Sequence, residues 1–245
     1  MGIQGLWDEL SPASEKKGIL PPHFGNKLIA ALSKLALEHW EKTGKPLRVA
    51  IDISIWSFQI QSGQKGSNPA LRTFHYRLCR LLQSNILPLF IFDGPHKPPF
   101  KRNKHTSSVP FTGGQQWWES TQLKRLIRAF GFCYWDAPGE AEAEAALLQR
   151  MGVVDIVITE DVDALMFGAG RVAREVFGGG TKHGKSHVVV YEYVEEKTGL
   201  DRDGLVLCAM MSGGDYLPAG LYNCGPKIAV EVTSPPPSPF IVAMC

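Results

Sequence analysis

The amino-acid sequence predicts an α/β fold in which helices flank a mostly parallel, twisted sheet. Three continuous apolar runs of strand length, at residues 47–53, 86–92 and 153–159, are typical of parallel strands covered on both faces. Segments with apolar residues at helical spacing separate these runs, and strands that alternate with helices favour a doubly wound sheet. The 245 residues are enough for one sizeable domain, and the sequence contains no internal repeat.

The expected elements follow one another in a regular order. Apolar residues recur at helical spacing in five segments, at residues 26–40, 71–82, 117–130, 139–151 and 204–211. Two strand patterns, at 172–177 and 187–193, lie on either side of a glycine-rich stretch, so we expect a hairpin there. Residues 96–116 are polar and basic and contain prolines, which predicts a loop.

The composition excludes several classes of protein. A net charge of +2 is lower than expected for a module that only binds phosphates. The five cysteines include no CxxC pair, which argues against a zinc site or a disulfide framework and fits a reducing compartment. No apolar run is long enough to span a membrane and no secretory signal begins the chain, so no membrane partner is expected.

Acidic residues gather where the predicted strands end. Asp52 and Asp93 lie at the ends of the first two strands, and Asp161 and Asp163 follow the third. Because the carboxyl ends of the strands form the ligand crevice of an open α/β sheet, we expect these side chains to converge. Three further acids lie at a predicted helix start and in a loop, namely Glu140, Glu142 and Asp215.

Carboxylates that share one crevice predict a metal site, because they would be costly to ionise together without cations. Mg²⁺ prefers carboxylate oxygen and water, and two ions roughly 4 Å apart would activate a water and stabilise the leaving oxygen of a phosphodiester. A single aspartate at a strand end is more often a turn or helix cap, so the metal hypothesis depends on the whole set. Glu140 and Glu142 point to opposite sides of a regular helix. Either Glu140 lies before the helix, or Glu144 is the true partner.

Six motifs, in order along the chain, resemble those of the flap endonuclease/XPG nucleases. They are MGIQGLW at the start, VAIDIS at 49–54, FIFDGP at 90–95, APGEAEAE at 137–144, VITEDVDALMFG at 157–168 and GGDYLPAGLYNCGPKIA at 213–229. The resemblance implies a PIN-like fold, two Mg²⁺ ions for which Mn²⁺ can substitute, and a nuclear location. It implies metal ligation, directly or through water, by Asp52, Asp93, Glu140, Glu142, Asp161, Asp163 and Asp215, and so selects Glu142 over Glu144 by analogy.

The same resemblance divides the chain into five regions. They are an N-terminal nuclease region (1–104), a short arch with the helix that follows it (105–130), an internal nuclease region (131–212), a partial helix-hairpin that binds DNA (213–231) and a tail outside the family pattern (232–245). The tail has four prolines and no charged residue. We therefore expect the C-terminal DNA-binding part to be truncated.

The segment between Asp93 and Glu140 indicates a branch of the family. The two residues lie 47 positions apart, whereas flap endonucleases place a longer helical arch there to thread a free 5′ end. The stretch FDGPHKPPFKRNKH also resembles fungal Holliday-junction resolvases, whose substrate has no end to thread. The resemblance implies an endonuclease that hydrolyses branched double-stranded DNA (Holliday junctions and 5′ flaps) in repair and recombination, with dimerisation on four-way junctions. Two alternatives stay open: a 5′-flap endonuclease of replication or excision repair, and a truncated, non-catalytic DNA-binding product.

Basic and glycine residues supply the expected DNA contacts, which are Gly2, Lys101, Arg102, Lys104, Gly220, Gly225 and Lys227. Lys101 and Arg102 are implied to lie over the scissile phosphate and stabilise developing charge, and a solvated loop is an equally weighted alternative. Residues 220–229 resemble a hairpin that holds duplex backbone through main-chain N–H groups and a monovalent cation such as K⁺. Asn223 replaces a glycine of the family pattern, and we expect the turn to survive because Asn tolerates left-handed backbone.

Two other patterns have simpler explanations. Residues 179–186 match the P-loop string, but a strand pattern follows where a P-loop requires a helix, so no nucleotide cofactor is expected. His183 and His187 flank a glycine in this loop and do not form a helical zinc pair. Lys124, Arg125 and Arg128 lie on a predicted helix, and solvent exposure is favoured over phosphate contact.

Overall fold

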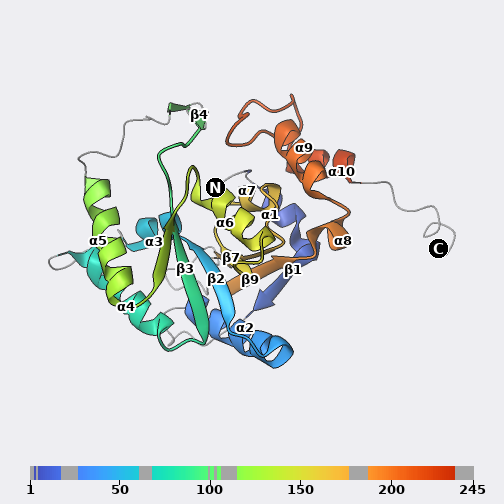
Figure 1. Cartoon of the computed structure of the whole chain (residues 1–245). Coiled ribbons are helices and arrows are strands. Elements are labelled where there is room, and N and C mark those ends of the chain that lie inside the picture. The colour runs from blue at the N-terminus through green and yellow to red at the C-terminus, as the bar shows by residue number, and fades with distance from the viewer. Residues whose placement is uncertain are drawn as a thin grey trace, which may run out of the picture.

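Seven strands form one mixed sheet in the order β1-β9-β8-β7-β2-β3-β6 (Figure 1). The computed structural model describes residues 3, 5–17, 27–60, 68–98, 100–101, 104–105, 115–176 and 187–234. The strands from β8 to β6 pair in parallel, while β9 pairs antiparallel with β8 and with β1. The predicted α/β class and mostly parallel sheet are confirmed.

The strands of the sheet are β1 (Ser14–Lys17), β2 (Leu47–Asp52), β3 (Ile86–Phe92), β6 (Cys133–Asp136), β7 (Ile156–Ile158), β8 (Arg171–Val176) and β9 (His187–Glu192). The five strands that the sequence predicts, β2, β3, β7, β8 and β9, begin and end within three residues of the expected positions. The predicted hairpin corresponds to β8 and β9. A separate pair, β4 (Phe100–Lys101) and β5 (Lys104–His105), forms a short hairpin in the segment for which the sequence predicts only a loop.

The order of the parallel strands changes direction at β2. From β2 the chain adds β3 and then β6 on one side, and it returns to place β7 on the other side of β2. In a parallel sheet such a change of direction opens a crevice at the carboxyl ends of the strands. Each of the predicted strand-end carboxylates lies at this edge.

Helices cover both faces of the sheet (Figure 1). One face carries α2 (Lys27–Thr43), α3 (Ile53–Ile60), α4 (Pro69–Leu81) and α5 (Gln115–Ala129). The other carries α1 (Leu6–Glu9), α6 (Ala141–Arg150), α7 (Asp163–Met166), α8 (Val194–Thr198), α9 (Arg202–Ser212) and α10 (Pro226–Thr233), with a short 3₁₀ turn at Ser11–Ala13. Among the described residues, no helix combines the length and apolar character that crossing a membrane requires.

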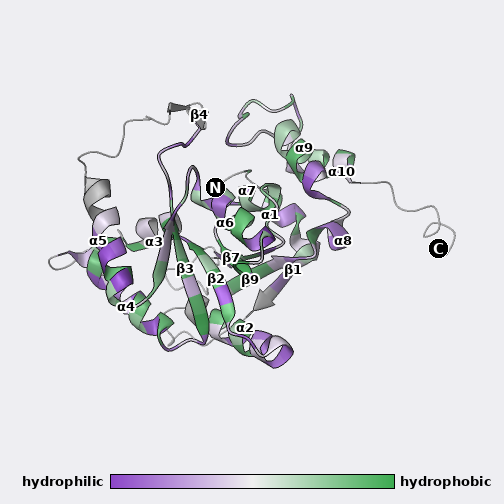
Figure 2. Ribbon diagram, in the orientation of Figure 1, coloured by the Kyte–Doolittle hydropathy of each residue, from purple (hydrophilic) through white to green (hydrophobic). Residues whose placement is uncertain are grey.

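Alternation along the strands divides the interior into two apolar cores. Val49 and Ile51 of β2 point into the core beneath α2 to α5, whereas Ala50 between them points into the core beneath α6. Trp56 and Phe90 belong to the first core, with ring centroids 5.6 Å apart and an edge-to-face angle of 71°. Figure 2 shows mostly hydrophobic residues along β2 and β3 and a mixture of hydrophilic and hydrophobic residues along α4 and α5.

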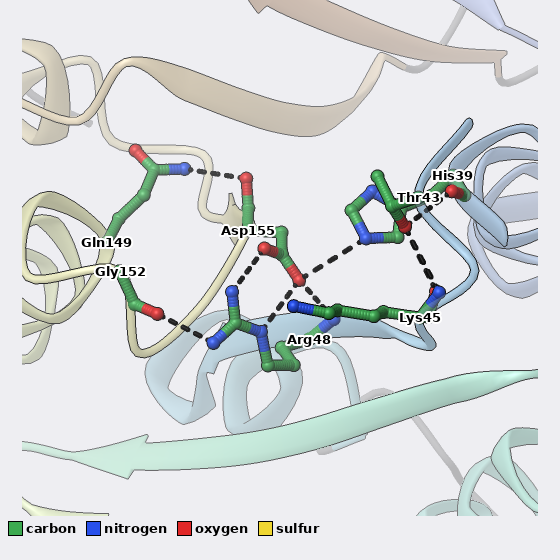
Figure 3. Close-up of polar contacts among 7 residues, drawn as sticks. All are labelled: His39, Thr43, Lys45, Arg48, Gln149, Gly152 and Asp155. Carbon is green, nitrogen blue, oxygen red and sulfur yellow. Dashed lines mark hydrogen bonds and ion pairs between the residues drawn. The ribbon is translucent and has the colours of Figure 1, made fainter.

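A polar network holds the opposite, amino-terminal edge of the sheet (Figure 3). Arg48 at the start of β2 donates to both carboxylate oxygens of Asp155, at 3.0 and 2.6 Å, and to the carbonyl oxygen of Gly152 at 2.6 Å. Burial alone would raise the pKa of Asp155, but the hydrogen bonds and charge of Arg48, with His39 nearby, outweigh it and lower the pKa. The bidentate pair fixes the loop between α6 and β7 against β2, far from the carboxyl ends of the strands.

Several elements were not anticipated. The sequence prediction omitted the strands β1 and β6 and the short helices α1, α3, α7 and α8. Helix α10 continues to Thr233, so the first two residues of the tail predicted at 232–245 are helical, while the boundary of the family pattern at 232 stays a prediction. The rest of that tail, from residue 235, lies outside the described residues, so its expected separation from the core stays a prediction.

Candidate metal centre

Carboxylates lie at the carboxyl ends of three strands that are neighbours in the sheet, β7, β2 and β3. Asp52 is the last residue of β2, Asp93 follows β3, and Asp161 lies three residues after the end of β7. Asp52 and Asp161 are buried, at 2% and 4% exposure, whereas Asp93 is exposed. The strand-end argument therefore predicted their shared location correctly.

Among the described residues, Asp161, Asp163 and Asp215 form one close acidic group. Each offers a carboxylate oxygen, and these oxygens lie within 4.8 Å of one another. All three residues are only 4% exposed. Three buried carboxylates at this separation repel one another unless a cation or protons neutralise them, and all-oxygen donors suit a hard divalent ion such as Mg²⁺.

Asp52 connects this group with Asp93. Its Oδ1 accepts hydrogen bonds from the backbone N–H and the hydroxyl of Ser54, at 2.9 and 2.7 Å, and its Oδ2 accepts from the Thr159 hydroxyl at 3.3 Å. Burial has the largest effect on the pKa of Asp52 and raises it, and the negative charges of Asp93 and Asp161 raise it further. The Ser54 hydrogen bonds lower the pKa but do not outweigh these effects. The pKa of Asp52 is therefore raised to about 6.

Replacing Asp52 with asparagine is expected to stabilise the metal-free protein above pH 6. The carboxyl loses its proton near pH 4 in the unfolded chain, whereas in the folded protein its pKa is raised to about 6. The free energy of unfolding is therefore highest near pH 4 and falls by about 3 kcal/mol as the pH rises through about 6. The amide side chain of the variant does not ionise and can still accept the Ser54 hydrogen bonds. In EDTA at pH 7.5, thermal unfolding of Asp52→Asn should have a midpoint roughly 6–12 °C higher than wild type.

The control for this measurement is Asp203→Asn, which removes an exposed carboxylate on α9. It should leave the midpoint within about 1 °C, because exposed substitutions change stability little. At pH 4 the Asp52→Asn and wild-type midpoints should converge. Equal midpoints of the two proteins at pH 7.5 would show that burial of this charge is not costly.

Asp93 also joins β3 to the start of α6. Its Oδ1 accepts from the Ala141 N–H at 3.0 Å, and its Oδ2 pairs with Lys97 at 2.6 Å. The backbone beside Asp93 also contacts the loop before α6, because the Gly94 N–H donates to the carbonyl oxygen of Gly139 at 2.7 Å. A carboxylate at a helix N-terminus is stabilised by the free N–H groups there. These contacts hold Asp93 next to Glu140.

The backbone geometry at the start of α6 helps to distinguish Glu142 from Glu144 as the partner of Glu140. Glu140 is the N-cap residue, with φ −81° and ψ 139°, so it lies outside the regular helix. Glu140 and Glu142 are buried at 7% and 6% exposure. Glu144 instead accepts a hydrogen bond from the Trp135 indole at 2.9 Å. This arrangement favours Glu142 over Glu144 as the partner of Glu140.

Two residues near the carboxylates were missed by the sequence prediction. The Tyr216 hydroxyl donates a hydrogen bond to Oε2 of Glu140 and so links the segment after α9 to the start of α6. Thr159 is fully buried and donates to Asp52, while its hydroxyl accepts from the Asp161 N–H at 3.1 Å. A hydroxyl at the end of an apolar strand was the available signal for Thr159. Nothing in the sequence marks the Tyr216 contact.

The predicted basic contacts are only partly described. Lys101 and Lys104 are register partners in the β4–β5 hairpin. Gly2 and Arg102 lie outside the described residues, as do the side chains of both lysines. Their predicted contact with phosphate therefore stays a prediction.

The predicted hairpin lies between α9 and α10. Gly220 has φ 56°, and a Cβ there would lie 2.7 Å from the backbone nitrogen of Gly213, so the position requires glycine. Asn223 adopts φ 57°, which confirms that this residue accepts the left-handed turn. Gly225 is the N-cap of α10, and Lys227 in its first turn is exposed.

The P-loop-like string at 179–186 and His183 lie outside the described residues. The residues that follow them form β9, as predicted, where a P-loop would continue into a helix. His187 begins this strand.

Comparison with known proteins identifies the family. Residues 1–109 match the profile of the XPG N-terminal domain, and residues 131–215 match that of the XPG I-region. The chain is 29% identical over 250 residues to Flap endonuclease GEN homolog 1 from Homo sapiens, covering 95% of this chain and 25% of that protein. It is 30% identical over 249 residues to Flap endonuclease 1 from Drosophila mojavensis, covering 84% of this chain and 63% of that protein.

Solved structures agree with these matches. A crystal structure of the Holliday junction-resolving enzyme GEN1 with product DNA and Mg²⁺ superposes with a TM-score of 0.71 at 43% identity, covering 94% of this chain and 51% of that one. The catalytic core of Rad2 with a DNA substrate superposes with a TM-score of 0.69 at 26% identity, covering 94% and 67%. The chain thus spans a quarter of the human relative and about half of the GEN1 structure. Since both nuclease regions match in order, the chain belongs to the flap endonuclease/XPG family.

Proposed function

We propose that this chain is the nuclease core of a Mg²⁺-dependent endonuclease that hydrolyses phosphodiester bonds of branched DNA in repair and recombination. The observation that carries the proposal is the group Asp161, Asp163 and Asp215, whose oxygens lie within 4.8 Å of one another at the edge that also carries Asp52. So many buried carboxylates at one place are costly for the fold unless cations neutralise them. The proposed division into regions at residues 104, 130, 212 and 231 belongs to the same proposal.

The carboxylates hold the metal ions in this mechanism. Asp161, Asp163 and Asp215 would hold one ion, and Asp52, Asp93, Glu140 and Glu142 would hold the second. Two bound Mg²⁺ ions, or Mn²⁺ in their place, would lower the pKa of the attacking water and neutralise charge on the leaving oxygen. Asp52 contributes as an anion, because bound cations favour its charged form against the burial that otherwise raises its pKa to about 6.

Basic residues and the hairpin position the DNA. Lys101 and Arg102 orient the scissile phosphate and stabilise its developing charge, and Gly2 and Lys104 contact the strand nearby. The hairpin that contains Gly220, Gly225 and Lys227 contacts duplex backbone with its N–H groups and a K⁺ ion. A junction-resolving relative solved with potassium, at 42% identity, supports this part of the proposal.

Four-way junctions are the proposed substrate class, with two copies of the protein on one junction. The 47-position separation of Asp93 and Glu140 and the 43% identity to the junction-resolving enzyme support this choice. A four-way junction requires two cuts, which two copies related by symmetry can make. We also propose a nuclear location, in keeping with a role in DNA repair.

The test compares cleavage of a labelled four-way junction, a 5′ flap and a linear duplex in Mg²⁺ and in EDTA. We expect cuts near the branch point, at least about tenfold faster on the junction than on the flap, and none in EDTA. Faster cleavage of the flap would assign the chain to flap endonucleases. Binding without cleavage by the folded protein would identify a non-catalytic DNA-binding product.

A further inference from the structure

The close acidic group of the candidate metal centre comes from two segments that lie far apart in the sequence, the loop after β7 and the loop after α9. The N-terminal part of the chain contacts the second of these loops. A Cβ on Gly214, the residue before Asp215, would lie 3.4 Å from Cγ1 of Ile3. Helix α1 also packs against α10, which follows the same loop.

Trp7 of α1 contacts the first of the two loops. Its indole N–H donates to the carbonyl oxygen of Glu160 at 3.2 Å, and Glu160 directly precedes Asp161. The Trp7 side chain is buried, and its ring centroid lies 4.4 Å from that of Tyr191. The Tyr191 hydroxyl donates to the carbonyl oxygen of Trp7 at 3.4 Å. A buried and well-packed indole is therefore joined by a hydrogen bond to the backbone of the loop that carries Asp161.

Arg174 of β8 contacts both partners of this hydrogen bond. Its guanidinium lies 4.8 Å from the centroid of the Trp7 ring, which is a cation–π distance. Its Nε lies 3.5 Å from Oε2 of Glu160, and Oε1 of Glu160 accepts from the Glu175 N–H at 3.0 Å. These contacts hold the Glu160 carboxylate at β8, and Glu160 is not a member of the close acidic group.

The backbone on the amino-terminal side of Asp161 is thus restrained by two separate contacts. The Thr159 hydroxyl accepts from the Asp161 N–H at 3.1 Å, and the Trp7 indole holds the carbonyl of the residue between them. Fixing this backbone fixes the direction in which the Asp161 side chain leaves it. Groups that orient metal ligands without touching the ion typically change metal affinity by about 10- to 100-fold when they are removed.

We infer that Trp7 is a positioning residue for the metal centre, because its indole hydrogen bond to Glu160 fixes the backbone from which Asp161 reaches the ion. The inference rests on the proposed function and deepens it, since it assigns a role in metal binding to a side chain that does not ligate the ion. A purely structural role would act differently. It would change the fraction of folded protein and leave the metal affinity of each folded molecule unchanged.

The test replaces Trp7 with phenylalanine, which keeps a buried aromatic ring and removes the N–H. The matched control is Trp56→Phe in the other apolar core, where the indole N–H is buried and has no hydrogen-bond partner among the described residues. Mn²⁺ affinity is measured by titration calorimetry without DNA, well below the thermal midpoint of each protein. Trp7→Phe should bind Mn²⁺ about tenfold more weakly, whereas Trp56→Phe should bind within about twofold of wild type.

Cleavage of branched DNA supplies a second measurement. In Trp7→Phe the Mg²⁺ concentration for half-maximal cleavage should rise about tenfold, while the rate at saturating Mg²⁺ stays within about threefold of wild type, because every carboxylate is still present. Arg174→Gln removes the charge beside the Trp7 ring and Glu160, so it should weaken Mn²⁺ binding in the same direction. Arg174→Lys keeps that charge and should restore part of the affinity. The Arg174 variants decide the question if Trp7→Phe does not fold.

Wild-type Mn²⁺ affinity in Trp7→Phe and Arg174→Gln would overturn the inference, even if both variants were less stable. An equal loss of affinity in Trp56→Phe would also overturn it, because any core substitution would then have the same effect. Wild-type protein that binds Mn²⁺ without cleaving branched DNA would overturn the proposed function alone, and calorimetry of the variants would still decide the role of Trp7. Wild-type protein that binds no Mn²⁺ would overturn both.

Discussion

Converting Asp161 and Asp163 together to asparagine should lower the single-turnover cleavage rate of branched DNA by at least about 10³-fold, equivalent to ~4 kcal/mol in the barrier. The two residues supply two of the three carboxylates whose oxygens lie within 4.8 Å of one another. Asparagine has nearly the same shape and can keep the hydrogen bond in which Asp161 accepts from the N–H of residue 163 at 3.2 Å. The variant therefore removes charge and metal affinity while leaving the local backbone in place.

DNA affinity should respond differently from the rate. Removing two negative charges from the proposed DNA-cleaving site should leave DNA affinity unchanged or increase it, and titration calorimetry with Mn²⁺ should detect fewer bound ions. The matched control Asp8→Asn/Asp203→Asn changes the net charge equally at exposed positions. It should cleave at the wild-type rate. Cleavage by Asp161→Asn/Asp163→Asn within about tenfold of wild type would contradict the assignment of the metal centre.

The location of the candidate metal centre could be predicted because of how parallel sheets are built. The runs at residues 47–53 and 86–92 are continuous and apolar, which marks strands covered on both faces. All such strands end at one edge, so acids directly after them must share it. Asp52 and Asp93 are 41 positions apart in the sequence, yet their charges interact in the structure. The prediction needed only strand positions and chain direction.

The unanticipated elements lack a local signal. β1 has the sequence SEKK and becomes a strand only because β9 offers an open edge for antiparallel pairing. β6, with the sequence CYWD, is an edge strand whose side chains are mostly exposed, so it shows no buried apolar run. In both cases pairing with a distant strand determines the conformation, and single-sequence patterns do not record such partners.

The contacts that the acidic side chains make were harder to predict than the edge of the sheet at which these side chains lie. The spacing of Glu140 and Glu142 could not decide between two partners, because the answer depends on where α6 begins. The extended backbone of Glu140 follows from the contacts of the preceding loop with Asp93 and Gly94. Those contacts cross from one strand end to another, and only the folded sheet brings them together.

Gly94 is the residue at which fold and site depend on each other most closely. Its backbone lies against the loop before α6, and a Cβ on Gly94 would lie 1.8 Å from the carbonyl oxygen of Ala137 and 2.6 Å from that of Pro138. Both obstacles are backbone atoms, which cannot rotate away as a flexible side chain can. The Ala137 N–H also donates to the carbonyl oxygen of Phe92 at 2.8 Å, so the loop cannot retreat without breaking hydrogen bonds to β3.

Gly94→Ala should therefore destabilise the protein by about 3 kcal/mol or more, and lower the thermal midpoint by roughly 6–12 °C. Gly170→Ala is the matched control, since nothing lies within 4 Å of a Cβ at that position. It should leave the midpoint unchanged or raise it slightly. In Gly94→Ala protein kept folded well below its midpoint, Asp93 and Glu140 can no longer share their present separation, so Mn²⁺ affinity measured by calorimetry should fall by at least about tenfold. If the variant kept both its midpoint and its metal affinity, the close approach of these two strand ends could not be what assembles the site.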